Sequence, residues 1–159
     1  ELQQAWQAIQ EEDGVHLHLI GPIPHSKRIK AKNVTYHGGI SNPKEIREIL
    51  DQCEALIAPS HSEGMPNAIM EAMARGLAIL TTPVGAIPSM VDEKNGAFVQ
   101  PADVQDLVLT LRAWMNLPSG EILAMQQASL DRVNSFRWPM IAQRTADAIS
   151  DYLARGEST

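Results

Sequence analysis

The sequence lacks the features that several classes of protein require. Its 159 residues include one cysteine, Cys53, so no disulfide can form within the chain, and a lone thiol fits a reducing compartment. No stretch approaches the roughly 18 apolar residues of a membrane span, and no signal peptide is visible. The formal net charge of −6 argues against a nucleic-acid-binding protein. The hydrophobic content of 44% is ordinary for a globular protein with one sizeable core.

Metal-binding patterns are also scarce. The chain has no Asp-x-Asp pair, and its five histidines show no local ligand spacing except for His16 and His18. Residues two apart in a strand share a face, so these two could ligate a metal ion. The sequence favours a plainer interpretation, in which they lie on the polar side of an alternating strand. We therefore expect no metal site.

Short apolar runs alternate with helical patterns through the first two thirds of the chain. This alternation predicts an α/β fold, with a Rossmann-like parallel sheet covered by helices on both faces. The predicted strands are Val15–Ile20, Val34–His37, Ala55–Pro59, Ala78–Thr82 and Ala97–Gln100. The predicted helices are Leu2–Gln10, Pro43–Cys53, Pro66–Arg75, Ile87–Val91 and Ala102–Met115.

The pattern changes at Ser119, after which no strand is expected. Residues 119–159 form a helical C-terminal segment of the same domain, with two helix patterns that break near residues 136–139. We expect Trp138 to pack at this break. A single domain is therefore predicted over residues 1–159.

The most informative stretch runs from Pro59 to Arg75 and places two carboxylates around a turn between a strand and a helix. Pro66 suits the first helical position, and Gly64 permits a close backbone approach or an unusual φ. Glu63 would lie outside the carboxyl end of its strand, where open α/β sheets bind ligands. Glu71 would project from the helix, and a carboxylate can accept hydrogen bonds from a vicinal diol.

A plainer interpretation of these acids also exists. Glu71 and Arg75 have the i, i+4 spacing of a surface ion pair, and Glu63 could be a solvated loop side chain. Residue spacing alone does not decide between the two interpretations. Free backbone N–H groups of Met65 and Asn67 would favour the first, because helix N-termini bind phosphate.

The residues around Glu63 and Glu71 resemble the sequences of retaining glycosyltransferases of the GT-B fold, most closely family four. That family shows a strand, Pro-Ser, two residues, Glu-Gly-x-Pro, four residues and Glu-Ala-Met-Ala-x-Gly. This chain matches at Pro59-Ser60, Glu63-Gly64, Pro66, Glu71-Ala72-Met73-Ala74 and Gly76, and then at Val84-Gly85 and Asn95-Gly96. The resemblance covers about residues 14–150 and would make the chain the C-terminal, nucleotide-sugar-binding half of such an enzyme.

The resemblance implies a site and a reaction. Glu63 would act at the donor sugar and is the catalytic candidate, and Glu71 would contact the ribose. The donor, a UDP-, GDP- or ADP-sugar, would be held by Ser60, Gly64, Met65, Pro66, Asn67, Glu71 and Gly85. No metal or other cofactor would be obligatory. The sugar would pass, with retention of configuration, to a glycan or lipid-linked acceptor, as in polysaccharide biosynthesis.

The chain also departs from the family pattern. Ala86 and Ser89 stand where the family often has glycine and glutamate. The family's first strand, the Arg and Lys that neutralise the diphosphate and the acceptor-binding domain have no counterpart, so we expect an N-terminally truncated chain that is inactive alone. Rival interpretations are a nucleotide-sugar epimerase or hydrolase, and a degenerate non-catalytic module. A cytoplasmic location is expected, and the basic run Lys27–Lys32 leaves peripheral membrane association of the full protein open.

Overall fold

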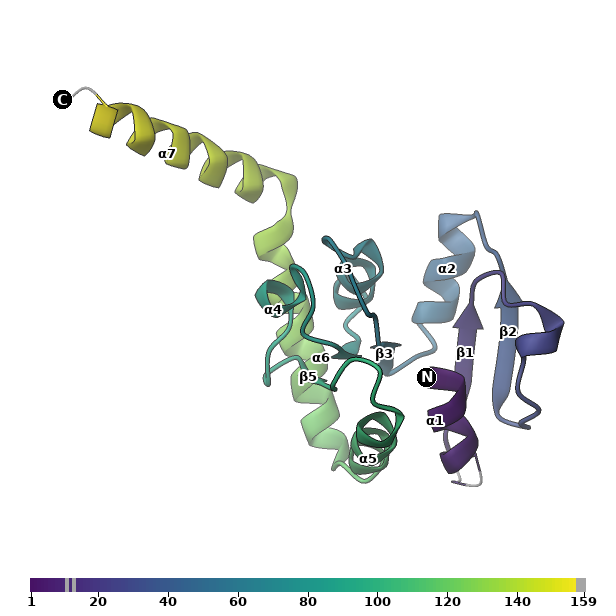
Figure 1. Cartoon of the computed structure of the whole chain (residues 1–159). Coiled ribbons are helices and arrows are strands. Elements are labelled where there is room, and N and C mark those ends of the chain that lie inside the picture. The colour runs from purple at the N-terminus through teal and green to yellow at the C-terminus, as the bar shows by residue number, and fades with distance from the viewer. Residues whose placement is uncertain (11, 13, 157–159) are drawn as a thin grey trace.

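The protein is an α/β structure in which helices and parallel strands alternate along the chain (Figure 1). The computed structural model describes residues 1–10, 12 and 14–156. The strands are β1 (Leu17–Ile20), β2 (Val34–Gly38), β3 (Ala55–Ala58), β4 (Ala78–Thr81) and β5 (Gly96–Phe98). The helices are α1 (Leu2–Ile9), α2 (Pro43–Leu50), α3 (Asn67–Ala74), α4 (Ile87–Met90), α5 (Val104–Met115), α6 (Ser119–Val133) and α7 (Trp138–Gly156), with short 3₁₀ turns η1 (His25–Lys27) and η2 (Asn134–Phe136).

The strands form two parallel sheets. β1 pairs with β2, and β4 lies between β3 and β5. The predicted α/β class and the parallel pairing are confirmed. β1 and β3 are not paired with each other, so the described strands lie in two separate parallel sheets.

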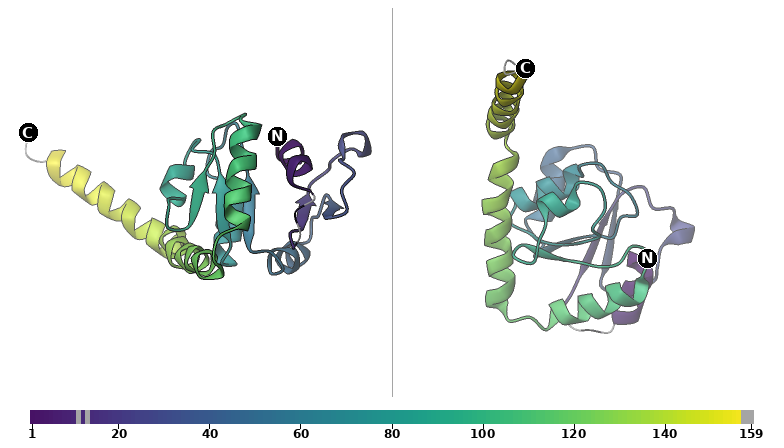
Figure 2. Two further views of the ribbon diagram at one scale, coloured as in Figure 1. Left: turned by 90° about the horizontal axis from the view of Figure 1, so that it is seen from below. Right: turned by 60° about the vertical axis from the view of Figure 1, so that its left-hand side comes forward.

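Helices cover both sides of the strands (Figure 2). On one side, α1 and α5 pack together over β1 and β4 through residues that include Trp6, Leu80 and Leu107. On the other side, α2, α3 and α4 pack against Ile79 of β4. Ile79 and Leu80 point to opposite faces because successive side chains of a strand alternate. One strand therefore contributes to both hydrophobic cores.

Local sequence signals fix several helix starts. The Asn42 side chain accepts a hydrogen bond from the Lys44 N–H at 3.0 Å and caps α2. Asp103 accepts from two backbone N–H groups and caps α5. The predicted start of that helix at Ala102 is wrong, because Ala102 has φ 62°, a left-handed conformation that cannot continue a helix.

The C-terminal segment is helical, as predicted, and its last three residues lie outside the described part of the chain. The break falls at η2 and Arg137, which is extended at ψ 142°. The expected packing role of Trp138 is wrong: its side chain is 84% exposed at the start of α7. α7 extends away from the rest of the molecule (Figures 1 and 2). Within the described residues, no helix combines the length and apolarity needed to cross a membrane.

Candidate donor-binding site

The loop between β3 and α3 is held in place by hydroxyl groups from the end of β4. The Thr81 hydroxyl donates to the Ala58 carbonyl at 2.8 Å, and the Thr82 hydroxyl donates to the Ser60 carbonyl. Both threonines are fully buried. A buried hydroxyl without a partner would be costly, so these bonds fix where the loop leaves the strand.

Gly85 supports the same loop from the other side. It has φ 57°, and a Cβ placed on it would lie 1.9 Å from the Glu63 carbonyl oxygen. The next residue, Ala86, donates its N–H to the Gly64 carbonyl at 2.9 Å. The structure therefore assigns Gly85 a direct reason to be glycine, which is backbone-to-backbone contact with the Glu63–Gly64 peptide.

Glu63 is a positioned, half-buried carboxylate. Its Oε1 accepts a hydrogen bond from the Ser60 hydroxyl at 2.9 Å. Glu63 is therefore held on one side by Ser60 and is only partly exposed to solvent. Its other oxygen has no partner among the described residues and is available to a ligand.

Gly64 differs from Gly85 in what surrounds it. Its φ is not positive, and a Cβ placed on it would meet nothing within 4 Å. Gly64 therefore leaves room for a ligand to approach the backbone closely, which is one of the two roles that the sequence allows. The positive φ that glycine would also permit is not observed. Nothing in the described chain requires glycine at this position.

The loop runs directly into the N-terminus of α3. Pro66 is the N-cap residue with ψ 114°, so its predicted place at the first helical position is wrong by one residue. No described atom accepts a hydrogen bond from the N–H groups of Gly64, Met65 or Asn67. The predicted free donors of Met65 and Asn67 are present, and they lie at the positive end of the helix dipole.

Glu71 is exposed on α3 and does not pair with Arg75. The Arg75 Nε instead donates to Asp51 at 2.6 Å, which ties α3 to the end of α2. The i, i+4 ion pair weighed above is therefore absent. Glu71 borders a groove of about 500 Å³ between α3 and the α6–η2 segment, which Phe136 and Arg137 also line.

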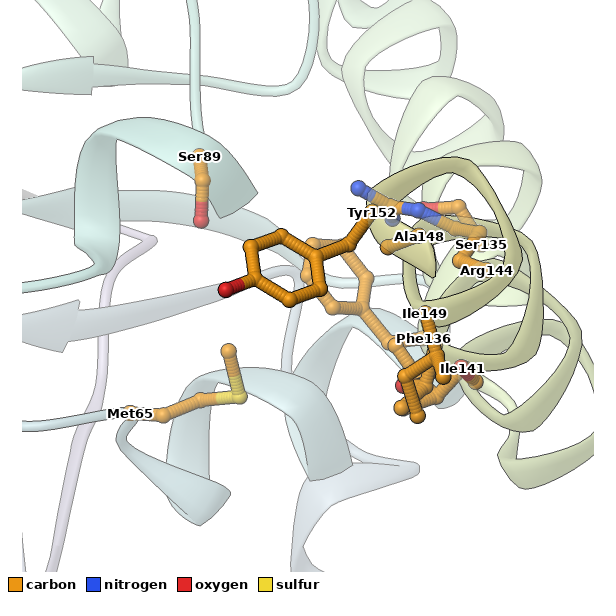
Figure 3. Close-up of a pocket in the computed structure, with 10 residues that line it drawn as sticks. Met65, Ser89, Ser135, Phe136, Ile141, Arg144, Ala148, Ile149 and Tyr152 are labelled. Carbon is orange, nitrogen blue, oxygen red and sulfur yellow. Dashed lines mark hydrogen bonds between the residues drawn. The ribbon is translucent and has the colours of Figure 1, made fainter. Parts of the chain in front are cut away.

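Met65 faces a second groove, of about 700 Å³, between the α3 loop and α7 (Figure 3). Ser89 of α4 lies on the same side of this groove, and Tyr152 of α7 extends toward both (Figure 3). Arg144 of α7 also lines it. The structure thus brings Ser60, Glu63, Gly64 and Gly85 together, while Met65 and Glu71 open onto two different grooves.

The sequence did not predict the supporting residues. The threonines at the end of β4 resemble ordinary strand residues, and the Arg75–Asp51 pair joins residues 24 apart. Ala86 has φ −84°, so the alanine at this departure from the family pattern is unstrained. The Ser89 hydroxyl turns back to the Ala86 carbonyl at 2.7 Å. In the described part of the chain, no three His, Cys, Asp or Glu side chains are arranged to hold a metal ion.

Comparison with known proteins identifies the family. The model for glycosyl transferases group 1 matches residues 1–116, so the chain belongs to this family. The putative colanic acid biosynthesis glycosyltransferase WcaL of Escherichia coli is 27% identical over 139 residues, which are 77% of this chain and 34% of WcaL. An MMP α-(1→4)-mannosyltransferase of Mycolicibacterium hassiacum is 29% identical over 74% of this chain and 29% of its own length. The chain thus spans about a third of these relatives.

Solved structures share the fold. Sucrose-phosphate synthase from Thermosynechococcus elongatus matches with a TM-score of 0.73 and 20% identity, over 97% of this chain and 42% of the synthase. Anabaena HepE in complex with UDP-glucose matches with a TM-score of 0.71 and 17% identity, over 94% of this chain and 45% of HepE. These likenesses support the Rossmann-like α/β fold, including its helical end.

Proposed function

We propose that residues 1–159 form the donor-binding part of a retaining glycosyltransferase and bind a nucleotide-diphosphate sugar. The observation that carries this proposal is the loop at the start of α3. It presents free N–H groups, a glycine that no internal contact requires, and a carboxylate with one unused oxygen. HepE, which shares the fold, has been solved with UDP-glucose, and this supports the choice of ligand.

The loop would serve two parts of the donor. The free N–H groups at the positive end of α3 would hold the diphosphate and stabilise the charge that grows on it as the sugar leaves. Glu63, fixed by Ser60, would accept hydrogen bonds from the sugar hydroxyls. The absence of a Cβ at Gly64 would let the sugar approach the backbone. In this scheme backbone dipoles take the role that a metal ion has in other transferases.

Glu71 would bind the ribose of the nucleotide. It has no ion-pair partner among the described residues, and it lies beyond the loop along α3. A carboxylate accepts both hydroxyl protons of a vicinal diol. The groove between α3 and η2, which Glu71 borders, would take the nucleoside.

The rest of the enzyme is proposed to lie outside residues 1–159. A further parallel strand would join β1 to β3, because both strands leave an edge unpaired in the described residues. An additional domain would bind the acceptor, which we propose is a growing glycan or its lipid-linked form at the cytoplasmic side of a membrane. Residues 1–159 alone would then bind the donor without transferring its sugar.

The proposal is tested by NMR titration of the chain with UDP, GDP and ADP. We expect shift changes that cluster at Gly64–Glu71 and Gly85–Ser89 for one nucleotide and that identify its base. Glu71→Ala should weaken binding about tenfold, as expected for a hydrogen-bonded charge worth roughly 1.5 kcal/mol. Glu121→Ala, an exposed acid in the first turn of α6, is the matched control and should leave binding unchanged.

Shift changes that lie elsewhere, or equal effects of the two variants, would contradict the proposed site. Absence of binding by all three nucleotides would contradict donor binding by this chain and favour a degenerate module. Rapid hydrolysis of a bound nucleotide sugar without acceptor would favour the rival hydrolase.

A further inference from the structure

Three histidines gather on one face of the two-stranded sheet, away from the candidate donor site. His18 lies on β1, His16 stands two residues earlier, just before that strand, and His37 lies on β2. Nδ1 of His18 is 2.9 Å from Nε2 of His37, and the two rings stack with centroids 5.2 Å apart. The His16 ring lies 4.8 Å from that of His18, and its Nε2 is 2.8 Å from the Thr35 hydroxyl.

The backbone pairing of β1 with β2 is irregular beside His37. The register passes from Leu19 opposite Tyr36 to Ile20 opposite Gly38, so His37 has no partner residue in the ladder. Such a bulge disrupts local pairing. The hydrogen bond between the two imidazoles therefore joins β1 to β2 where the ladder is irregular.

Whether the hydrogen bond between His18 and His37 can form depends on the protonation state of the two rings. A hydrogen bond between two imidazole nitrogens needs one N–H and one lone pair, so at least one of the two rings must be neutral. The pair can accept one extra proton, but a second proton leaves two N–H groups facing each other. His16 has no such restriction, because the Thr35 hydroxyl can donate to it or accept from it.

The surroundings of His18 disfavour its protonation. Burial lowers the pKa of His18, and the neighbouring charges of His16 and His37 lower it further. No carboxylate of the described residues forms an ion pair with any of the three rings. Arg28 stacks on Tyr36, whose side chain lies on the opposite face of β2 from Thr35 and His37. A further positive charge would therefore be uncompensated.

We propose that the His16, His18 and His37 cluster is a proton-sensitive contact, which holds β1 to β2 at neutral pH and releases the pair in mildly acidic solution. The direction follows from proton linkage. In the unfolded segment His18 binds a proton at the ordinary histidine pKa of about 6.5, whereas in the folded pair its pKa is lower. Stability of the pair is therefore full above that pH and is lost as the pH falls through the lower value of the folded state.

Hydrogen exchange measured by NMR tests this in the whole chain at about pH 7.5 and about pH 5.5, the range in which histidine changes charge. The Leu17 and Gly21 amides, which donate to Asn33 and Gly38, report on opening of β1 from β2. The Ile79 and Val99 amides report on β4 and β5, whose strands contain no histidine. After correction for intrinsic rates, the opening constant should rise several-fold at the first two amides and stay unchanged at the others.

The variant His37→Gln should remove most of this pH dependence, because an amide side chain does not titrate in this range. His25→Gln is the matched control, since His25 lies in the exposed η1 turn, and it should leave the pH dependence intact. Equal opening at all four amides, or no change with pH, would overturn the proposal. If His37→Gln does not fold, imidazole NMR of the natural chain decides: titration of His18 at or above about pH 6.5 would also overturn it.

Discussion

The two sheets of this protein are built from similar apolar strands but differ in how far the strand residues are buried. Every residue of β4 is fully buried, and both hydrophobic cores meet on this strand. In β1 only Leu17 is buried, and Ile20 is 38% exposed. The stabilising contribution of an apolar strand residue therefore depends on how many neighbouring elements bury it. The candidate site adjoins the three-stranded sheet, where the scaffold is most constrained, while the histidine cluster lies on the two-stranded sheet.

The largest effect is expected from removing side-chain volume from β4. Leu80→Ala should lower the free energy of unfolding by about 2–5 kcal/mol, because a fully buried leucine leaves a cavity. Leu19→Ala in β1 should cost about half as much, since Leu19 is only half-buried. Urea unfolding of both variants measures the difference. Equal losses would show that the two sheets are equally well packed.

A smaller but sharper test compares two glycines beside the candidate site. Gly85→Ala should cost about 2–4 kcal/mol, because its Cβ would overlap the Glu63 carbonyl and its φ is positive. Gly64→Ala should change stability by less than about 0.5 kcal/mol, because its Cβ would enter open space. Thermal unfolding measures the loss of stability in each of the two variants, and nucleotide titration measures the effect of each on binding. A stable Gly85→Ala chain would contradict the backbone contact described here.

The ion pair between Arg132 of α6 and Asp92, in the loop after α4, should make the free energy of unfolding depend on pH. Arg132 donates to Asp92 at 2.6 Å. Burial alone would raise the pKa of Asp92, but hydrogen bonds from the Lys94 N–H and Arg132 outweigh it and lower the pKa. The contribution of this pair is thus full above the ordinary aspartate value of about 3.9 and is lost as pH falls below it.

Asp92→Asn should therefore cost about 1 kcal/mol at neutral pH and nothing once Asp92 is protonated. Urea unfolding at a series of pH values measures this. Asp131→Asn, on exposed α6 surface, is the control. A constant difference between Asp92→Asn and the natural chain down to the lowest pH would contradict the assignment.

The smallest effect is expected at Trp138. Because this side chain is 84% exposed, Trp138→Ala should change the stability of the chain by less than about 0.5 kcal/mol. Trp6→Ala should instead cost about 3–5 kcal/mol, since Trp6 of α1 is 3% exposed and packs in the same core as α5. Denaturant titration of both variants distinguishes them. A large loss at Trp138 would show that α7 packs against the body in solution.

Sequence periodicity predicted the order and type of the elements, because each strand and helix has its own hydrophobic pattern. It also placed Glu63, Gly64 and Glu71 around a strand–loop–helix turn, since those signals are local. It could not predict Arg75–Asp51 or Thr82–Ser60, which join residues far apart in sequence. The role of Trp138 was mispredicted because an aromatic residue beside a break has the same pattern whether or not another element covers it.

The contact at Gly85 has a consequence for how the site can change over evolutionary time. On the Gly85 side the frame around Glu63 is built from main chain meeting main chain, so its shape there depends on one missing methyl group. Met65, in the loop before α3, faces the groove beside α7 and takes no part in this backbone contact, so it can vary without disturbing that frame. New ligand preferences can then arise by surface substitution while the scaffold stays constant.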